Sequence, residues 1–193
     1  SAGKSQEAER LAREAVALTE ETDALNLTGD ALLPEHATLM HSFYLATLDG
    51  KWGVPYLNRD FFDEVFRTMK DRTLLVLARH GAGRPVAGAL FFLKDTSLFG
   101  RYWGAAQQVR NLHFELCYYQ AIDFAIEQGF TLLEAGAQGE HKLARGFLPS
   151  LTYSAHNIRD PAFGRAIREY IESEKEMLKG VMEEYSSHDP YKR

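Results

Sequence analysis

The segment from Glu134 to Gly146, EAGAQGEHKLARG, holds two carboxylates, a histidine, a lysine, an arginine and three glycines. Carboxylate and imidazole groups can exchange protons with a substrate, whereas ammonium and guanidinium groups bind anions. The apolar run before it, residues 130–133, is too short for a helix between Gly129 and the glycines that follow. That run therefore predicts a buried strand that opens into a candidate site.

Gly136 and Gly139 would let the backbone turn sharply or approach a ligand closely. If residues 139–146 form one or two helical turns, a spacing of three and four residues gives them a shared polar face. The members of that face would be Gln138, His141, Lys142 and Arg145. Such a face could present several donors to an anionic group. A solvated junction between a strand and a helix carries similar residue types, so a purely structural interpretation competes with the functional one.

Composition excludes several classes of protein. With 193 residues, 45% of them hydrophobic, the chain can bury a core of its own, and its net charge of −5 argues against generic nucleic-acid binding. A local basic patch around Lys142 and Arg145 is still compatible with this net charge. The single Cys117 excludes an internal disulfide framework, and we expect a cytoplasmic protein. No apolar run reaches the length of a membrane span, so none is expected.

Periodicity predicts two domains of unequal size. Residues 1–22 form an N-terminal helical arm with an alanine-rich face, and residues 23–193 form the main domain with a long C-terminal helix. In the main domain, residues 24–33 could hold a strand. Helices follow from Pro34 to about Leu48 and from a cap at Asn58 to about Met69.

A change of period then predicts a sheet. Residues 73–79, 85–93 and 97–103 are three strands with hairpin-length connections, hence an antiparallel meander. A helix over residues 112–128 comes next, with Phe114, Cys117, Tyr118, Ala121, Ile122 and Ala125 on its buried face. We expect the strand at residues 130–135 to lie parallel to the last meander strand.

The remaining residues predict one strand and one helix. The strand covers residues 151–158, and Asp160 and Pro161 begin the long helix. A buried stripe on that helix would comprise Phe163, Ile167, Tyr170, Ile171, Leu178, Val181, Met182 and Tyr185.

This order of elements matches the acyltransferase fold of the GNAT superfamily, an α/β (α+β) fold whose mixed sheet contains an antiparallel meander flanked by helices. The motifs LHFELCYYQ (residues 112–120), EAGAQGEHKLARG, KWGVPY (51–56) and GRYWG (100–104) resemble the bacterial FemAB-like family of predicted N-acyltransferases, labelled peptidoglycan biosynthesis/recognition. The resemblance extends from about Leu39 to the C-terminus. Members usually contain two GNAT-like halves, so we expect this chain to correspond to the C-terminal half. Its partner would be an N-terminal half or a second copy in a homodimer.

The resemblance implies acyl transfer to an amine, which needs a base, a polarised carbonyl and a stabilised leaving group. Glu134, at the end of a buried strand, is the first candidate base, with a raised pKa. His141 is the second candidate base or acid, with Glu140 to orient it. Tyr102, Tyr118 or Tyr119 could protonate the leaving group, although aromatic residues at helical spacing usually belong to a core. Candidate substrate contacts are Gln138, Lys142, Arg145, Arg101, His113 and Tyr119.

The loop that would bind the activated donor differs from that of acetyl-coenzyme A enzymes. Those enzymes hold the pyrophosphate on a glycine-rich loop before the helix, whereas residues 104–113 contain one glycine and no such motif. We therefore expect coenzyme A to bind weakly. The resemblance implies an aminoacyl-tRNA or another activated donor, with acyl-CoA as the alternative and an amine on a small molecule or peptide as acceptor.

The sequence also bears on a non-catalytic role, on metal binding and on the single cysteine. A GNAT-like half without its phosphate loop could instead be a catalytically silent recognition or assembly domain, since one fold hosts many functions. No metal site is expected, because His113 and Glu115 lie two residues apart on a helix and face different ways. Cys117 is predicted to be a small buried hydrophobic residue rather than a nucleophile.

Overall fold

The computed structural model describes residues 22–48, 54–80, 83–107, 109–136 and 140–187. It divides at Ala137 and Gln138 into two compact units, and each is described by itself. The predicted N-terminal arm lies outside the described residues, except for Thr22, which begins the first strand. Within the described residues, no helix combines the length and the apolar character that crossing a bilayer requires.

The first unit is built on a five-stranded sheet in which sequence order is also spatial order. Its strands are β1 (Thr22–Thr28), β2 (Thr73–His80), β3 (Pro85–Lys94), β4 (Ser97–Ala105) and β5 (Leu132–Glu134). Neighbours pair antiparallel from β1 to β4, while β5 pairs parallel with β4. The predicted meander and its parallel fifth strand are confirmed.

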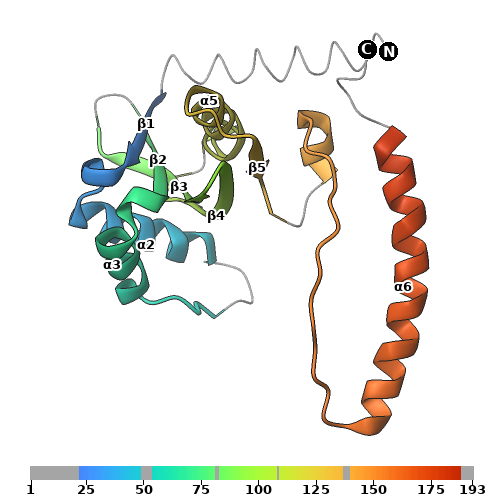
Figure 1. Cartoon of the computed structure of the whole chain (residues 1–193). Coiled ribbons are helices and arrows are strands. Elements are labelled where there is room, and N and C mark those ends of the chain that lie inside the picture. The colour runs from blue at the N-terminus through green and yellow to red at the C-terminus, as the bar shows by residue number, and fades with distance from the viewer. Residues whose placement is uncertain (1–21, 49–53, 81–82, 108, 137–139, 188–193) are drawn as a thin grey trace. The chain divides into compact units, whose positions relative to one another are not determined.

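Helices α2 (Pro34–Leu48) and α3 (Arg59–Thr68) cover one face of the sheet (Figure 1). Proline at the first position suits a helix start, because its missing N–H has no helical acceptor to lose. At α3 the Asn58 side chain accepts a hydrogen bond from the Phe61 amide at 3.1 Å, which confirms the predicted cap. Alternate strand residues such as Leu75 and Leu77 pack with these helices.

Residues 112–127 form a continuous helical segment on the opposite face (Figure 1). It consists of α4 (Leu112–Phe114), a π-helical turn η3 (Glu115–Tyr119) and α5 (Gln120–Glu127). The predicted helix is confirmed, but the prediction of its buried face is wrong in part. The residues packed in the core are Leu112, Leu116, Ala121, Phe124 and Ala125, while Phe114 and Ile122 are only partly buried. The π turn causes this shift, because it adds one residue between successive core positions.

The second unit contains a short 3₁₀ helix, η4 (Glu140–Arg145), and the long helix α6 (Pro161–Ser187). Asp160 Oδ1 accepts from the Phe163 amide at 2.7 Å, so the predicted cap of α6 is confirmed. The predicted strand at residues 151–158 is wrong, since these residues form no strand. A strand needs a partner for its backbone groups, and the described residues of this unit contain no other strand.

The predicted buried stripe on α6 is also wrong. Phe163 is 59% exposed and Tyr170 is 63% exposed, while Ile167 and Ile171 are only partly buried. The described residues of this unit include no sheet and no second long helix that could cover the stripe. Sequence periodicity thus identified the apolar side of the helix but not whether anything packs on it.

Candidate functional site

The site begins where two neighbouring strands part. β5 pairs with β4 only at Ser97, Leu98 and Phe99, whereas β4 continues to Ala105. Beyond Phe99, the described residues place no strand along that side of β4. Backbone groups on this side of residues 100–105 therefore have no ladder partner, and a ligand could use them.

A β-bulge in β4 changes the direction of the side chains at the same point. Leu90 of β3 pairs with Tyr102 and Phe91 pairs with Gly100, so Arg101 is the extra residue. Side chains of a regular strand alternate between faces, and an extra residue resets that alternation. Tyr102 consequently joins the α2 and α3 side, while the next residue, Trp103, packs on the α5 side.

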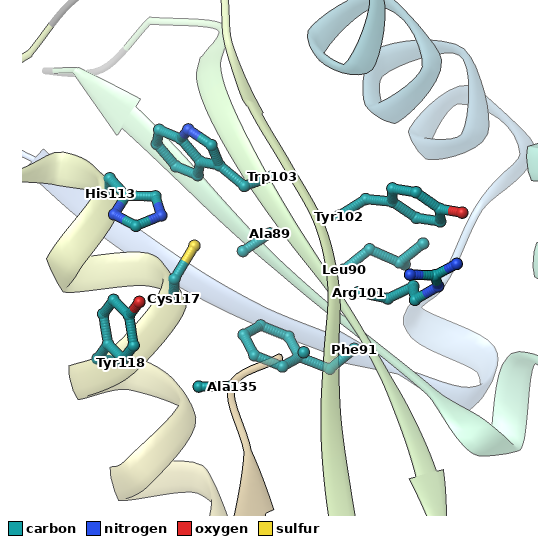
Figure 2. Close-up of a pocket in the computed structure, with 11 residues that line it drawn as sticks. Ala89, Leu90, Phe91, Arg101, Tyr102, Trp103, His113, Cys117, Tyr118 and Ala135 are labelled. Carbon is teal, nitrogen blue, oxygen red and sulfur yellow. The ribbon is translucent and has the colours of Figure 1, made fainter. Parts of the chain in front are cut away.

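A cavity of about 170 Å³ lies beside this bulge (Figure 2). β3 and β4 supply most of one wall, the helical segment 112–127 supplies the other, and the residue after β5 closes one end. The lining residues are Ala89, Leu90, Phe91, Gly100, Arg101, Tyr102, Trp103, His113, Cys117, Tyr118 and Ala135. Three sequence-predicted site residues, Arg101, Tyr102 and His113, are among the lining residues. Figure 2 shows the Arg101 and Tyr102 side chains on the other side of β4 from His113, so the side chains of the three do not meet.

The helical wall carries the groups suited to proton transfer. The His113 ring lies 5.2 Å from the Trp103 ring and 5.6 Å from the Tyr118 ring, measured between centroids. Figure 2 shows His113, Cys117 and Tyr118 on the helix opposite Trp103 of β4. Burial raises the pKa of the Cys117 thiol, so the sulfur stays protonated at neutral pH. A nucleophilic cysteine acts as the thiolate, so this state does not favour a nucleophilic role. Cys117 is only partly buried, but it packs against the core as a hydrophobic residue.

Tyr102 belongs to an aromatic cluster on the other side of β4. Its hydroxyl lies 3.4 Å from the Tyr56 hydroxyl, and its ring packs against Tyr44 and Phe61. Arg101 lies 4.9 Å from the centre of its ring, as in a cation–π contact. Burial, and then the Tyr56 hydroxyl, raises the pKa of Tyr102 to about 12. A hydroxyl that holds its proton this firmly is a weak general acid near neutral pH.

The glycine-rich motif starts at the mouth of this cavity. Ala135 is part of the lining, and Gly136 has φ of 79°, a conformation that glycine adopts without strain. Glu134 is exposed at the end of β5. The burial on which its predicted role as a base depended is therefore not observed.

The rest of the motif belongs to the second unit. Gln138 and the side chains of Glu140 and His141 lie outside the described residues. Residues three apart align in a 3₁₀ helix, so Lys142 and Arg145 share a face of η4. Burial lowers the pKa of Lys142. Convergence of the motif's charged residues with Glu134 on one cleft stays a prediction.

Sequence reasoning missed part of the cavity wall. Tyr119 was a predicted contact but is not among the lining residues, whereas Trp103 and Cys117 are. The π turn was also missed, although the sequence contains its signal in the five-residue step between Leu116 and Ala121. Among the described residues, no three histidine, cysteine or acidic side chains lie close enough to hold a metal ion.

Comparison with solved structures found several that align with part of this chain. L-PGS from Bacillus licheniformis aligns with a TM-score of 0.50 and 10% identity, over 65% of this chain and 40% of that chain. This chain therefore spans less than half of that protein. An aminoglycoside acetyltransferase from an uncultured soil metagenomic sample aligns with a TM-score of 0.49 and 13% identity, over 74% and 97% of the two chains. Ribosomal-protein-alanine N-acetyltransferase from Brucella melitensis biovar Abortus 2308 aligns with a TM-score of 0.46 and 18% identity, over 72% and 99%.

At such identities the L-PGS likeness concerns the fold alone. Together with the strand pairing, it confirms the predicted mixed α/β fold with a meander and a parallel fifth strand. The search of curated proteins found no match. The family description FemAB-like, peptidoglycan biosynthesis/recognition, matches residues 4–193, nearly the whole sequence. The chain belongs to the FemAB-like family.

Proposed function

We propose that this chain is an N-acyltransferase that moves an acyl or aminoacyl group from an activated donor to an amine. The observation that carries the proposal is the cavity beside the bulge of β4, at the point where β5 ends, in a member of the FemAB-like family. Such a cavity combines an apolar wall, a strand edge and groups that can exchange protons. Acyl transfer needs these three features together.

The volume of the cavity suits a small acyl group. An apolar cavity of about 150 Å³ holds a benzene molecule, so about 170 Å³ accommodates an acyl or aminoacyl group with a short side chain. Phe91 and Trp103 provide apolar surface for it. The unpaired edge of β4 beyond Phe99 would offer amides to the oxygen that gains charge when the carbonyl is attacked.

Both proton transfers of the reaction use the helical wall of the cavity. The amine nitrogen attacks the carbonyl carbon of the donor, and His113 accepts the proton that this nitrogen releases, directly or through a water molecule. The tetrahedral intermediate then collapses, the bond from carbon to the leaving oxygen or sulfur breaks, and the amide remains. Tyr118 donates a proton to the leaving group and is reprotonated from solvent, while His113 returns its proton to solvent. Glu134, His141 and Glu140 stay candidate bases or orienting groups from the sequence motif.

The start of the helical segment favours an aminoacyl ester over coenzyme A. A pyrophosphate cradle needs amides that point away from the first helical turn. Here the amides of Phe114 and Glu115 both donate to the Asn111 carbonyl, at 2.8 and 3.1 Å, and the Leu112 amide donates to Val109. These amides are already engaged, so we propose aminoacyl-tRNA as the donor and the free amine of a peptidoglycan peptide as the acceptor.

A transfer assay with defined donors tests this proposal. The purified chain is incubated with radiolabelled aminoacyl-tRNA or acetyl-CoA and with a muramyl peptide that carries a free lysine amine. We expect labelled peptide from the aminoacyl-tRNA and little or none from acetyl-CoA. Calorimetry with free coenzyme A should show no binding in the micromolar range.

Tyr118→Phe and Tyr119→Phe provide the matched pair of variants. Both remove one hydroxyl from neighbouring residues of the same turn, but only Tyr118 lines the cavity. Loss of a general acid lowers turnover by about a hundredfold, so Tyr118→Phe should show that loss and Tyr119→Phe should not. Equal activity of both variants would remove Tyr118 from the mechanism. Absence of transfer with every donor and acceptor would favour a recognition domain instead.

A further inference from the structure

The helical wall of the cavity contains a feature that the proposed reaction does not use. Core residues of the segment 112–127 follow each other in steps of four, five and four, at Leu112, Leu116, Ala121 and Ala125. The step of five coincides with the π turn from Glu115 to Tyr119. π turns are rare and occur mostly within α-helices at functional sites, so this one requires a physical cause.

A pair of side chains spans this turn. Glu115 Oε1 accepts a hydrogen bond from Gln120 Nε2 at 2.9 Å, and the two residues are five positions apart. A π turn repeats from residue i to i+5, so both side chains leave the helix on the same side. We call this pair the Glu115–Gln120 clasp.

The clasp is unusual because Glu115 is only 6% exposed. Carboxyl groups are rarely buried without a partner, since loss of water is costly unless a hydrogen bond replaces it. Burial raises the pKa of Glu115, the negative charge of Asp123 adds to this effect, and the Gln120 amide opposes it. Removal of Gln120 would leave a buried carboxyl without this hydrogen bond.

The turn that the clasp spans also shapes the cavity. Cys117 and Tyr118 lie within the turn and line the cavity, and Tyr118 is only 3% exposed. In an unbroken α-helix, Tyr118 would lie about 200° around the axis from Leu116, which packs in the core. The wider turn rotates Tyr118 back toward the side of His113 and Cys117, where Figure 2 shows it.

We infer that Glu115 and Gln120 are positioning residues of the cavity, because their hydrogen bond holds the π turn that brings Tyr118 and Cys117 into its wall. Neither residue is among those that line the cavity, so both act through Tyr118 and Cys117. The effect on catalysis rests on the proposed function. The effect on the cavity wall does not.

Cys117 allows a test that needs no activity. It is the only cysteine of the chain and lies within the turn, so a change in its alkylation by N-ethylmaleimide under native conditions reports on this part of the wall. Four variants are compared with the wild type. Glu115→Ala and Gln120→Ala each break the clasp, Glu115→Gln keeps a side chain that can bond to Gln120, and Glu127→Ala removes an exposed carboxylate from the same helical segment.

We expect alkylation about tenfold faster in Glu115→Ala and Gln120→Ala, because a lost hydrogen bond of this kind shifts a local opening equilibrium by about that factor or more. Glu115→Gln and Glu127→Ala should react at the wild-type rate. Circular dichroism and a thermal melt establish that each variant is folded. A folded Glu115→Ala or Gln120→Ala protein whose alkylation rate stays within twofold of wild type would overturn the inference. If Glu115→Ala and Gln120→Ala both fail to fold, the pair is a purely structural contact, and the inference is likewise overturned.

The transfer assay adds a second readout. If transfer is observed, Glu115→Ala should lower kcat while leaving KM for the amine unchanged, because a displaced Tyr118 affects only the transition state. Glu115→Gln should restore kcat. If the wild type shows no transfer activity but the clasp variants are alkylated faster, the proposed function is wrong and the positioning role is still supported.

Discussion

At the scale of single residues, His113 and Glu134 are alternative candidates for the base that accepts the proton of the amine. His113 lies in the cavity wall, whereas Glu134 is exposed at the end of β5. We predict that His113→Gln lowers turnover by about a hundredfold or more, because a base must lie within reach of the proton that it accepts. Glu134→Gln should have a smaller effect. Both substitutions preserve hydrogen bonding, so initial rates at saturating donor can be compared directly.

The reverse order of effects would move the base to Glu134. In that case the glycine-rich motif, rather than the helical wall, would carry the chemistry. Thermal melts of both variants serve as the control, since neither change should alter the midpoint by more than a few degrees.

Tyr102 gives a prediction about pH dependence. Its pKa is raised to about 12 in the folded chain, compared with an ordinary value of 10.0 for tyrosine. Between these values the unfolded chain has lost the proton and the folded chain has kept it, so stability falls as pH rises from about 10 to 12. Absorbance at 295 nm should show a late contribution from Tyr102 that is missing in Tyr102→Phe. A titration of that variant identical to wild type would contradict the assignment.

At the scale of elements, Gly104 decides how closely α2 packs on β4. A Cβ atom at this position would overlap the carbonyl group of Phe43, which is backbone and cannot rotate away. We predict that Gly104→Ala destabilises the chain by about 2 kcal/mol or more, because α2 must then shift from the sheet. The melting temperature should fall by about 4–8 °C.

Gly180→Ala is the matched control for this change. Gly180 lies within α6, and a Cβ atom added there would have nothing within 4 Å. The same addition of a methyl group should there favour the helix by about 1 kcal/mol. Equal melting temperatures for the two variants would mean that α2 does not require close contact at Gly104.

The elements also show how far sequence reasoning reaches. Pro34, the Asn58 cap and the hairpin turns predicted α2, α3 and the meander, because each acts through local chemistry. The π turn was not predicted, because Leu116 and Cys117 are both apolar and so fit either face. The strand expected at residues 151–158 had suitable residue types, but propensity cannot supply a partner strand.

For the candidate site, too, the sequence predicted some features and not others. The residue types of Arg101, Tyr102 and His113 identified them as candidates, and all three border the cavity, but only the His113 side chain lies on its helical side. Burial was less predictable. Glu134 was expected to be buried because its strand is apolar, but β5 is the sheet's edge strand and only three residues long. A short edge strand leaves its last side chain in solvent.

At the scale of the whole molecule, the chain divides so that both hydrophobic clusters lie in the first unit. Every residue of those clusters precedes Glu134, and the cavity residues end at Ala135. A domain with its own core can in principle fold alone. We predict that a chain shortened after Gly136 still unfolds cooperatively, with far-UV circular dichroism and a thermal melt as the measurements.

The shortened chain also tests the C-terminal part of the motif. Lys142 and Arg145 would be absent from it, and both were predicted to bind an anionic part of the substrate. We expect its transfer activity to fall by about tenfold or more, because each charge-assisted hydrogen bond contributes about 1.5–3 kcal/mol. The full-length double variant Lys142→Gln, Arg145→Gln should show a similar loss, which separates the two side chains from the rest of the second unit. If the shortened chain transfers at the full rate, the second unit does not contribute to the reaction. If the shortened chain is inactive but the double variant transfers at the full rate, other residues of the second unit make the contribution.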